Sequence, residues 1–491
     1  MKNRIRKIIT GCAILVSHIA AITAQESRPN ILFIAVDDLR TELGCYGVDQ
    51  IITPNIDRLA SKGTVFKRAY CQQAVCSPSR TSLMTGLRPD KTKVYDLHTH
   101  FRSTIPDAIT IPQYFKRHGY YTRGFGKIYH GLLDDPLSWS EQTDILKKLK
   151  LKVVSEENSQ FIASNIGTTI AEAEKNRSKG LSTKSPPAYV CNNLPDSLQG
   201  DGKLAYQTVK LLKDPKMKES PFFLAVGFRK PHLPFIAPKK YWDYYNPEKI
   251  DKANNPFYPK NVPEIALTSW GELRRYQDIP QKGPLSAEQA KKLKHGYYAC
   301  VSMIDSFVGM LMNTLEEQGL AENTIVILWG DHGWKLGEHN MWCKHTNFEI
   351  DTNAPLICYS PNQKKNGTQT NALVEFVDIF PTLCELAGLP IPEQLQGKSF
   401  VPLLDQPGKK WKEAVFSQFP RPGGIMGYSM RTDRYRFNLW FDKEKNVIAK
   451  ELYDHKIDPE ENENVVNDLK YKTLLKRYSM ALLDQIEEYK K

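Results

Sequence analysis

Three continuous apolar segments of strand length constrain the fold of this chain more than any other feature. They lie at residues 31–36, 222–227 and 324–329. An unbroken apolar segment of this length is typical of a strand covered on both faces, as in the parallel sheet of an α/β protein. Helical segments lie between them, notably residues 53–60 and 286–318. The sequence therefore predicts an α/β domain whose large, mixed but mainly parallel sheet is sandwiched by helices.

Polar side chains follow each of these predicted strands. Asp37 and Asp38 follow the first, His232 lies after the second, and Asp331 and His332 follow the third. Ligands of open α/β sheets bind at the carboxyl ends of the strands, and carboxylates offer the oxygen ligands that Ca²⁺ and Mg²⁺ prefer. The pattern favours a divalent-cation site. An Asp-Asp pair also suits a turn or helix cap, and an imidazole suits calcium less well than an amide oxygen.

A second feature is the pentapeptide Cys-Ser-Pro-Ser-Arg at residues 76–80, which has the pattern C-x-P-x-R. Basic side chains elsewhere could surround it. Lys127 and His130 follow another predicted strand or turn, and Lys344 follows a Met-Trp-Cys segment. Each alone would ordinarily be a surface lysine or a structural histidine. Beside an acidic metal cluster, they and Arg80 would form a cationic pocket suited to sulfuryl or phosphoryl transfer.

The N-terminus has the features of an export signal. Four basic residues among the first seven precede a largely apolar segment at residues 8–22, and Thr23 and Ala24 offer a small-residue cleavage site. The apolar segment is short for a membrane span, which needs about 20 residues, and no later segment resembles one. The sequence predicts export to the periplasm or secretion. A lipoprotein attached through Cys12 is less favoured, because little apolar sequence precedes that cysteine.

Composition excludes several classes of protein. The 491 residues are 41% apolar and 25% charged, which is typical of globular proteins rather than of disordered or coiled-coil chains. The net charge of +12 falls to about +8 without the four basic residues of the signal. No nucleic-acid motif accompanies this surplus, which either aids solubility or attracts a polyanion. The nine cysteines are irregularly spaced without a C-x-x-C pair, so neither a zinc site nor a disulfide framework is expected, although a single disulfide stays open.

The chain divides into two predicted domains after the signal at residues 1–24. Residues 25–405 would form the large domain with the site, and the polar, lysine-rich residues 134–205 would be an insertion in it. A Pro-rich segment at residues 389–402 precedes a small α+β domain at residues 406–491. That domain is predicted to hold antiparallel strands and a closing helix, at residues 414–417, 425–431, 435–440 and 467–489.

Together these motifs resemble the type I, formylglycine-dependent sulfatases of the alkaline phosphatase superfamily. Within that family, Gly-Lys-x-x-His at residues 126–130 and Asp-His at residues 331–332 are similar to the iduronate-2-sulfatase branch. The resemblance implies an alkaline phosphatase-like fold and the hydrolysis of a sulfuric ester. It covers most of the chain, through residues 30–46, 72–86, 114–130, 221–235, 331–344 and 426–435.

The resemblance also implies a role for each matching residue. A maturation enzyme would oxidise Cys76 to formylglycine, and the hydrated aldehyde would supply one hydroxyl to attack sulfur and a second to expel sulfate. One Ca²⁺, or alternatively Mg²⁺, would be bound by Asp37, Asp38, Asp331, His332 and the modified Cys76. The further catalytic residues would be Arg80 and Lys127 beside the diol, His232 and Lys344 at the sulfate and the leaving oxygen, and His130 as the base.

The same branch implies a sulfated oligosaccharide as the substrate. The specific expectation is the 2-O-sulfate of a terminal uronic acid in a glycosaminoglycan, and other sulfated sugars stay open. Residues 95–102 align with a loop near the pocket in that family, so His98 and Arg102 are candidate ligands of the uronate carboxylate. Trp334 could stack on a sugar or pack in the core.

Two other functions stay open on the sequence alone. A phosphomonoester or phosphodiester hydrolase of the same superfamily could have the same C-x-P-x-R pattern. A member of the sulfatase family that has lost its catalytic activity could bind sulfated glycans without hydrolysing them. The acidic cluster and the export signal favour the sulfatase, and every matching catalytic position is filled.

Overall fold

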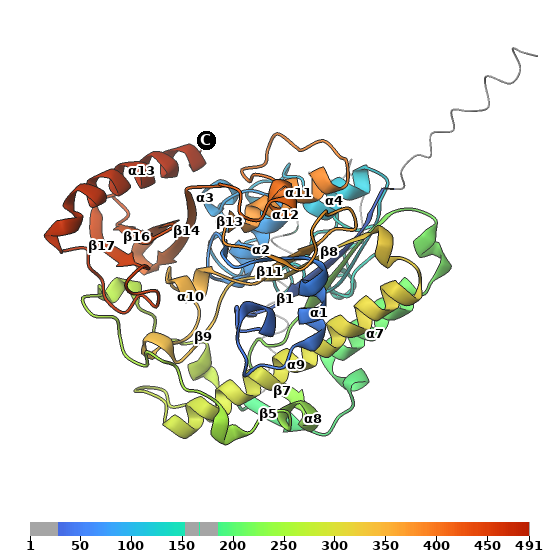
Figure 1. Ribbon diagram of the computed structural model, residues 1–491, viewed down its shortest axis with the longest axis horizontal. Coiled ribbons are helices and arrows are strands. Elements are labelled where there is room, and N and C mark those ends of the chain that lie inside the picture. The colour runs from blue at the N-terminus through green and yellow to red at the C-terminus, as the bar shows by residue number, and fades with distance from the viewer. Residues whose placement is uncertain (1–27, 153–165, 167–184, 491) are drawn as a thin grey trace, which may run out of the picture.

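The computed structural model describes residues 28–152, 166 and 185–490. The predicted export signal and Cys12 lie outside the described residues, as does most of residues 153–184 in the predicted insertion. A seven-stranded sheet forms the centre of the molecule (Figure 1). Its order is β12 (Thr368–Thr370), β2 (Thr64–Phe66), β11 (Leu356–Tyr359), β8 (Thr324–Gly330), β1 (Asn30–Val36), β6 (Phe222–Phe228) and β4 (Tyr121–Gly126).

The three predicted apolar strands are central neighbours in this sheet. Strand β1 pairs in parallel with β6 on one side and with β8 on the other. Every residue of these three strands is buried. Strand β4 continues the parallel pairing beyond β6, whereas β11 is antiparallel to β8. The prediction of a mixed, mainly parallel sheet is confirmed.

Alternate side chains of β1 enter two hydrophobic cores, one on each face of the sheet. Leu32 and Ile34 lie in one core, and Ile31 and Phe33 lie in the other, because successive side chains of a strand point to opposite faces. The first face is covered by α1 (Pro54–Lys62), α7 (Gly200–Leu212) and α9 (Ala287–Glu317) (Figure 1). The second is covered by α2 (Cys76–Thr85), α4 (Ile111–Arg117), α11 (Ile379–Leu386) and α12 (Val401–Asp405).

Helix α9 confirms the predicted helix at residues 286–318. It begins with a capping box, in which Ser286 accepts from the backbone of Gln289 and the Gln289 side chain accepts from the backbone of Ser286. Among the described residues it is the one helix long and apolar enough to cross a membrane. However, 83% of its apolar 18-residue stretch is buried inside the protein. It is therefore a core helix in this structure.

Short elements connect the large sheet to its surroundings. Strand β5 (Tyr189–Asn192), from the end of the predicted insertion, pairs with β7 (Phe235–Pro238). The other short elements are β3 (Ala69–Tyr70) with β13 (Val374–Glu375), β9 (Lys335–Leu336) with β10 (Trp342–Cys343), and helices α3 (Pro89–Thr92), α5 (Asp144–Lys148), α8 (Lys239–Trp242) and α10 (Glu349–Thr352).

None of the eight cysteines among the described residues is in a disulfide.

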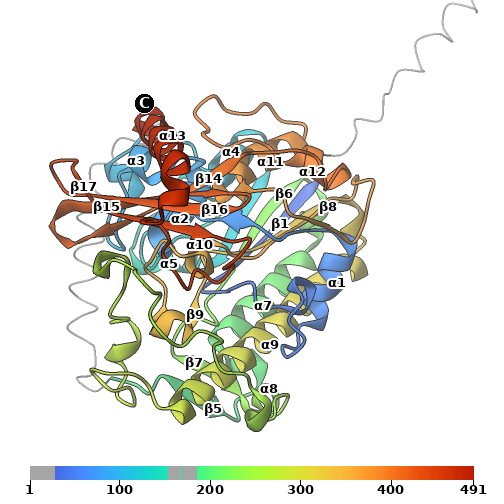
Figure 2. The same cartoon turned by 60° about the vertical axis from the view of Figure 1, so that its left-hand side comes forward.

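A second, antiparallel sheet follows near the C-terminus (Figure 2). Three of its strands confirm predictions, and the fourth was not predicted because its first half is largely exposed. The closing helix begins five residues later than predicted, since Asp468 caps the 3-10 turn Leu469–Tyr471 that precedes it. The elements are β14 (Ala414–Arg421), β15 (Ile425–Thr432), β16 (Tyr435–Phe441), β17 (Val447–Asp454) and α13 (Lys472–Lys490).

Strand β14 joins this second sheet to the segment that precedes Cys76. The backbone N–H of Gln418 donates to the carbonyl of Gln72 at 2.8 Å. The hydroxyl of Ser417 donates to the carbonyl of Cys71 at 2.6 Å. The C-terminal sheet thus helps to fix the approach of the chain to helix α2.

Candidate active site

Cys76 is the first residue of helix α2, and all ten residues of that helix are buried. Pro78 lies in the first turn, where its missing N–H costs no helical hydrogen bond. Arg80 lies four residues after Cys76 and therefore on the same face of the helix. The spacing C-x-P-x-R thus places a thiol beside a guanidinium at a buried helix start.

The Arg80 guanidinium joins the ends of two central strands. Its Nε donates to Asp331 Oδ2 at 2.9 Å, and its Nη2 donates to Asp37 Oδ1 at 3.2 Å. Its Nη1 donates to the backbone carbonyls of Lys127 and Ile128. The side chains of Arg80 and both aspartates are fully buried. Because β1 and β8 are parallel neighbours, their following aspartates meet at one edge of the sheet.

Two lysines complete the charge balance of this edge. Lys127 forms an ion pair with Asp37, and Lys344 Nζ lies 2.9 Å from Asp38 Oδ1. Three aspartates at the strand ends thus face three cations. The aspartates are Asp37, Asp38 and Asp331, and the cations are Arg80, Lys127 and Lys344. A bound dication would therefore give this edge a positive charge, which favours an anionic ligand.

Cys76 belongs to two groups of potential metal ligands. Its Sγ lies with Asp38 and His332 in one group and with Asp37 and Asp331 in the other, with donor atoms within 4.8 Å of one another. His332 Nδ1 faces the carbonyl of the next residue at 2.9 Å, which turns Nε2 toward the thiol at 3.4 Å. The structure thus brings all five predicted ligands together. Three of them are carboxylates, so the donor set fits a hard divalent cation.

Burial and neighbouring charges shift the pKa values of these groups in different directions. Burial raises the pKa of the Cys76 thiol well above its usual value, and the charge of Asp37 adds to the rise. Burial also raises the pKa of Asp38, against the opposing charge of Lys344. For Asp37, burial is outweighed by Lys127 and other cations, which hold the pKa well below its usual range. Because the thiolate is the reactive form of cysteine, unmodified Cys76 is poorly suited to nucleophilic attack.

His130 lies beside these groups with an unpaired ring nitrogen. Its Nδ1 is buried and has no hydrogen-bond partner among the described residues. Burial, together with the charges of Lys127 and Arg80, lowers the pKa of His130 to about 2. The imidazole is therefore neutral near neutral pH, and a neutral imidazole can accept a proton.

One residue of the site was not singled out by the sequence analysis. Glu272 Oε1 lies 3.1 Å from His232 Nε2, and its Oε2 lies 3.0 Å from Lys344 Nζ. Lys344 thereby bridges Glu272 and Asp38. Glu272 directly precedes the 3-10 turn Leu273–Arg275 in an irregular loop. It follows no strand and belongs to no motif, so no sequence signal marks it.

Two predictions of substrate-binding residues need correction. Arg102 is buried, and its five N–H groups are used by Asp135, Gln113 and two backbone carbonyls, so none is left for a uronate carboxylate. Trp334 is only 1% exposed, and Lys344 Nζ lies 4.6 Å from its ring centre, so it packs rather than stacks on a sugar. His98 lies on an exposed loop.

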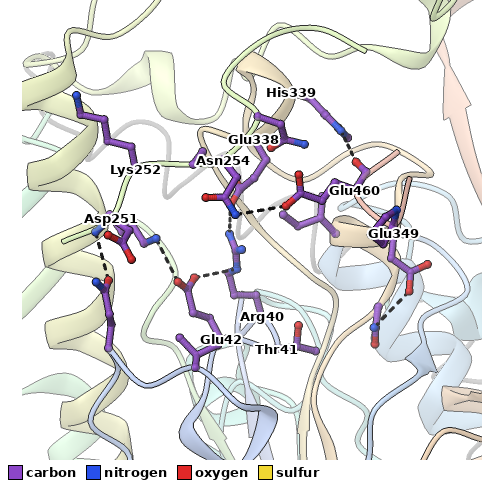
Figure 3. Close-up of a pocket in the computed structure, with 18 of the residues that line it drawn as sticks. Arg40, Thr41, Glu42, Asp251, Lys252, Asn254, Glu338, His339, Glu349 and Glu460 are labelled. Atoms are coloured by element: carbon purple, nitrogen blue, oxygen red, sulfur yellow. Dashed lines mark hydrogen bonds and ion pairs between the residues drawn. The ribbon is translucent and has the colours of Figure 1, made fainter. Parts of the chain in front are cut away.

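A separate cavity of about 600 Å³ lies between residues 40–50, 251–255 and 459–461 (Figure 3). None of the predicted catalytic or metal-binding residues lines it. Two of its basic side chains, Arg40 and Lys294, are paired within its wall. Arg40 contacts Glu338 at 2.9 Å and Glu42 at 3.1 Å, and Lys294 contacts Glu42 at 3.2 Å. The residues predicted to carry the chemistry lie at the strand ends and not in this cavity.

Known proteins resemble this chain over nearly its whole length. The sequence matches the family described as Sulfatase over residues 29–389, and the family described as N-sulphoglucosamine sulphohydrolase, C-terminal, over residues 337–488. It is 34% identical to an iduronate 2-sulfatase of Mus musculus over 529 aligned residues, which cover 91% of this chain and 92% of that protein.

Two solved structures share the fold at lower sequence identity. One is BT4656 in complex with its substrate D-glucosamine-2-N,6-O-disulfate, with a TM-score of 0.74 and 22% identity over 94% of this chain and 98% of the other. The second is a phosphonate monoester hydrolase of Agrobacterium radiobacter, with a TM-score of 0.71 and 22% identity over 94% and 96%. At this identity the structures establish the fold, which includes both the large sheet and the C-terminal one.

Proposed function

Since this chain belongs to the sulfatase family and is a sulfuric ester hydrolase, we propose that it removes sulfate from a sulfated glycan at Cys76. One observation supports this most strongly. At a buried helix start, Cys76 meets the aspartates of two parallel strand ends, with Arg80 one helical turn away. That arrangement offers a reactive position, a cation site and a guanidinium within one small volume.

The proposal includes conversion of Cys76 to formylglycine. When hydrated, that aldehyde supplies one hydroxyl that attacks sulfur and a second that, once deprotonated, expels sulfate. Ca²⁺ is the favoured ion, and Asp37, Asp38 and Asp331 with His332 and residue 76 would hold it. Bound there, it would polarise the sulfate oxygens as a Lewis acid.

The residues on the helix side of the site would orient the nucleophile. Arg80 is locked by two aspartates and two carbonyls, so its charge is fixed beside residue 76 without reorganisation. Lys127 is held by Asp37. The unpaired Nδ1 of His130 would take the proton from the second hydroxyl.

The residues on the opposite side would act on the leaving group. His232 and Lys344 lie next to Asp38, and both side chains can donate hydrogen bonds. We expect them to bind the sulfate oxygens. As the bond between sulfur and the ester oxygen breaks, its electron pair stays on the sugar oxygen, which would receive a proton from this pair.

The favoured substrate is the 2-O-sulfate of a terminal uronic acid. Identity of 34% to an iduronate 2-sulfatase supports this choice. A dication bound at the strand ends would attract the anionic sulfate ester. The predicted export signal fits action on polysaccharide outside the cytoplasm.

A screen of sulfated disaccharides that differ only in sulfate position and uronic acid epimer tests this substrate. We expect the highest kcat/KM for a non-reducing terminal 2-O-sulfated uronic acid. Preference for a 6-O- or N-sulfated hexosamine would contradict the proposed substrate and leave the sulfatase activity intact. Cys76→Ala, which cannot form the aldehyde, should lose turnover on every member of the panel.

A phosphoester hydrolase is the second candidate, because the fold is shared with a phosphonate monoester hydrolase. Rates on an aryl sulfate and on the matching aryl phosphate or phosphonate separate the two. We expect the sulfate to be the better substrate. A large preference for the phosphorus ester would overturn the proposal.

A further inference from the structure

Glu272 occupies an unusual position for a carboxylate in a pocket that accepts an anion. It lies between the two donors placed at the leaving group, with Oε1 3.1 Å from His232 Nε2 and Oε2 3.0 Å from Lys344 Nζ. Its side chain is only 18% exposed. A buried carboxylate is costly unless it is paired, so the two donors and Glu272 form one mutually dependent group.

The hydrogen bonds of His232 fix the orientation of its ring. Nδ1 lies 2.6 Å from the carbonyl of Leu233, which can only accept. Nε2 consequently points toward Glu272, whose carboxylate also only accepts. With Nδ1 held by the Leu233 carbonyl, the contact with Glu272 fixes the direction in which Nε2 points.

Lys344 is held in a comparable way. Its ammonium lies 2.9 Å from Asp38 Oδ1 and 3.0 Å from Glu272 Oε2. An ammonium has three N–H donors, so pairing with two carboxylates leaves one for a ligand. Asp38 faces the ion site, whereas Glu272 faces the leaving-group side. Without Glu272, only the contact with Asp38 would restrain the ammonium, on the side away from the departing oxygen.

We propose that Glu272 is the positioning residue of the leaving-group side, where it holds His232 and Lys344 together as the pair that protonates the departing sugar oxygen. This inference rests on the proposed function. It adds a residue that acts through its two neighbours and is not expected to touch the sulfur or the nucleophile. Its effect should therefore grow as the leaving group becomes a poorer one.

Leaving-group dependence is the test that a merely structural role would not alter. The kcat/KM values of fully matured wild-type enzyme and Glu272→Gln are measured on aryl sulfates whose phenols span a range of acidity, and on a sulfated sugar. Glu272→Gln keeps the shape of the side chain but removes its charge. We expect a loss of about 10²-fold on the sugar sulfate and less than about 5-fold on the most acidic phenol.

The slope of the logarithm of kcat/KM against phenol pKa should become steeper in Glu272→Gln. A partly unfolded preparation lowers every rate by the same factor and leaves this slope unchanged, so the test stands even if the variant is less stable. Glu272→Asp, which retains the charge at a shorter reach, should recover part of the wild-type slope. Glu264→Gln is the matched control, because Glu264 is an exposed residue of the same loop; its slope should equal that of wild type.

An equal loss on all substrates, or no loss on the sugar sulfate, would overturn the role of Glu272. Failure of the proposed function looks different. In that case the wild-type enzyme, with residue 76 fully converted, would itself fail to hydrolyse the sulfate esters.

Discussion

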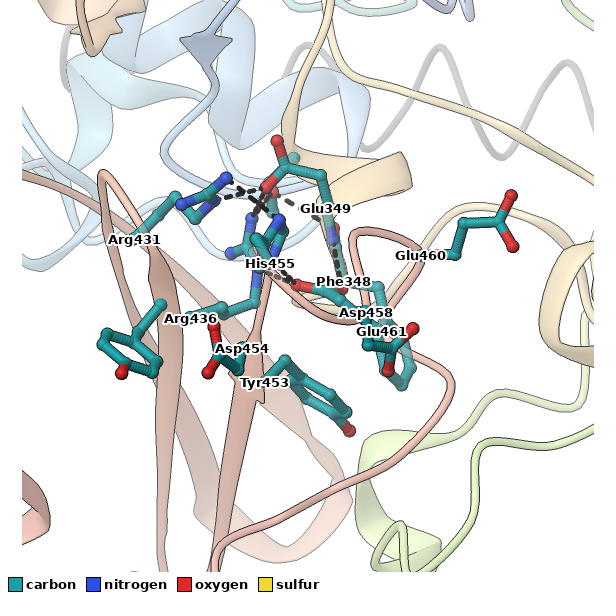
Figure 4. Close-up of polar contacts among 12 residues, drawn as sticks. Phe348, Glu349, Arg431, Arg436, Tyr453, Asp454, His455, Asp458, Glu460 and Glu461 are labelled. Carbon is teal, nitrogen blue, oxygen red and sulfur yellow. Dashed lines mark hydrogen bonds and ion pairs between the residues drawn. The ribbon is translucent and has the colours of Figure 1, made fainter. Parts of the chain in front are cut away.

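Two buried clusters of charge in this molecule use similar residues for different purposes. The strand-end cluster consists of Asp37, Asp38, Asp331, Arg80, Lys127 and Lys344 beside Cys76. The junction cluster lies between the large domain and the C-terminal sheet (Figure 4) and consists of Glu349, Glu461, Arg431, Arg436 and His455. Each contains residues close enough to share a metal ion, among them Glu349, His455 and Glu461 in the junction.

The difference lies in whether the hydrogen-bonding capacity is used up. In the junction cluster, Glu349 accepts from Arg431 at 2.9 Å and from Arg436 at 2.6 Å. Glu461 accepts from Arg436 at 2.6 Å, from His455 at 2.9 Å and from the backbone of Glu349 at 2.7 Å. A metal ion would have to displace two guanidinium groups from these carboxylates. The junction cluster is therefore complete without a ligand.

The strand-end cluster retains unused groups. Among the described residues, the Cys76 thiol is within hydrogen-bond distance of His332 Nε2, at 3.4 Å, and His130 Nδ1 has no partner. The comparison shows that residue type and proximity do not distinguish a site from a structural ion-pair network. In these two clusters the difference lies in the groups that are left without a partner.

Removal of metal should separate the two clusters most strongly. We expect a chelator to lower kcat/KM by at least about 10³-fold, because the dication supplies several kcal/mol of charge stabilisation, and added Ca²⁺ should restore it. Elemental analysis of the active protein should find one ion per chain. Two ions per chain would mean that the junction also binds metal.

Matched variants assign the ion to one cluster. Asp38→Asn should lower the affinity for the ion, and Glu461→Gln should leave both stoichiometry and affinity unchanged. If ion affinity fell in Glu461→Gln and not in Asp38→Asn, the metal site would lie in the junction cluster instead of the strand-end cluster.

Loss of a junction arginine should affect stability more than chemistry. Arg436→Ala would leave Glu461 and Glu349 buried without the guanidinium that joins them, and breaking a buried ion pair typically costs about 3–5 kcal/mol of unfolding free energy. Denaturant unfolding measures that loss, and kcat per folded molecule should stay within a factor of about 2. A large fall in kcat for the folded enzyme would mean that the junction takes part in catalysis.

How much of this contrast is visible in the sequence depends on the kind of signal. Unbroken apolar strands predicted β1, β6 and β8 as buried neighbours, and the polar residues that follow them meet as expected. The C-x-P-x-R spacing predicted a shared helix face. These features are local or follow from a regular sheet, so pattern alone is sufficient.

The remainder depends on contacts between segments far apart in the chain. Glu272 reaches the site from an irregular loop. Arg102 forms a buried ion pair with Asp135, and no periodic pattern in the sequence predicts that contact. The junction residues lie up to 112 positions apart along the chain. In the sequence, each of these is an ordinary charged residue. Only the folded structure shows which side chains have all their hydrogen-bonding groups paired.

Acid should weaken the ion pairs of Glu375, which contacts Arg88 of the large domain and Lys412 next to the C-terminal sheet. Burial disfavours a charged Glu375, yet Arg88 and Lys412 outweigh it and lower the pKa of Glu375 to about 2. A carboxyl whose folded pKa is depressed stabilises above its unfolded value and loses that contribution as pH falls toward the folded pKa. We expect unfolding free energy to decrease by on the order of 2 kcal/mol between about pH 4.5 and pH 2.

Denaturant unfolding followed across this pH range measures the effect. Glu375→Gln should be less stable at neutral pH and should show a shallower decline with acid. An unchanged slope in that variant would assign the acid sensitivity to other carboxyls.

Arg421 links the two regions more weakly. Its guanidinium donates to the carbonyls of Ile265 and His345, both at 2.9 Å, and so fastens the segments that hold Glu272 and Lys344. We expect Arg421→Ala to reduce kcat/KM by about 10-fold, a change of about 1.4 kcal/mol. Arg434→Ala, which removes a partly exposed ion pair with Asp454, is the matched control and should leave kcat/KM unchanged.

The most direct test of this account relates the chemical state of residue 76 to turnover. Preparations with different extents of maturation are digested, and the fraction of residue 76 present as aldehyde is measured from peptide mass, since the aldehyde is lighter than the thiol. The account predicts that kcat on a sulfated disaccharide rises in proportion to that fraction and extrapolates to zero for unmodified cysteine. Full turnover by protein whose residue 76 is entirely cysteine would contradict it.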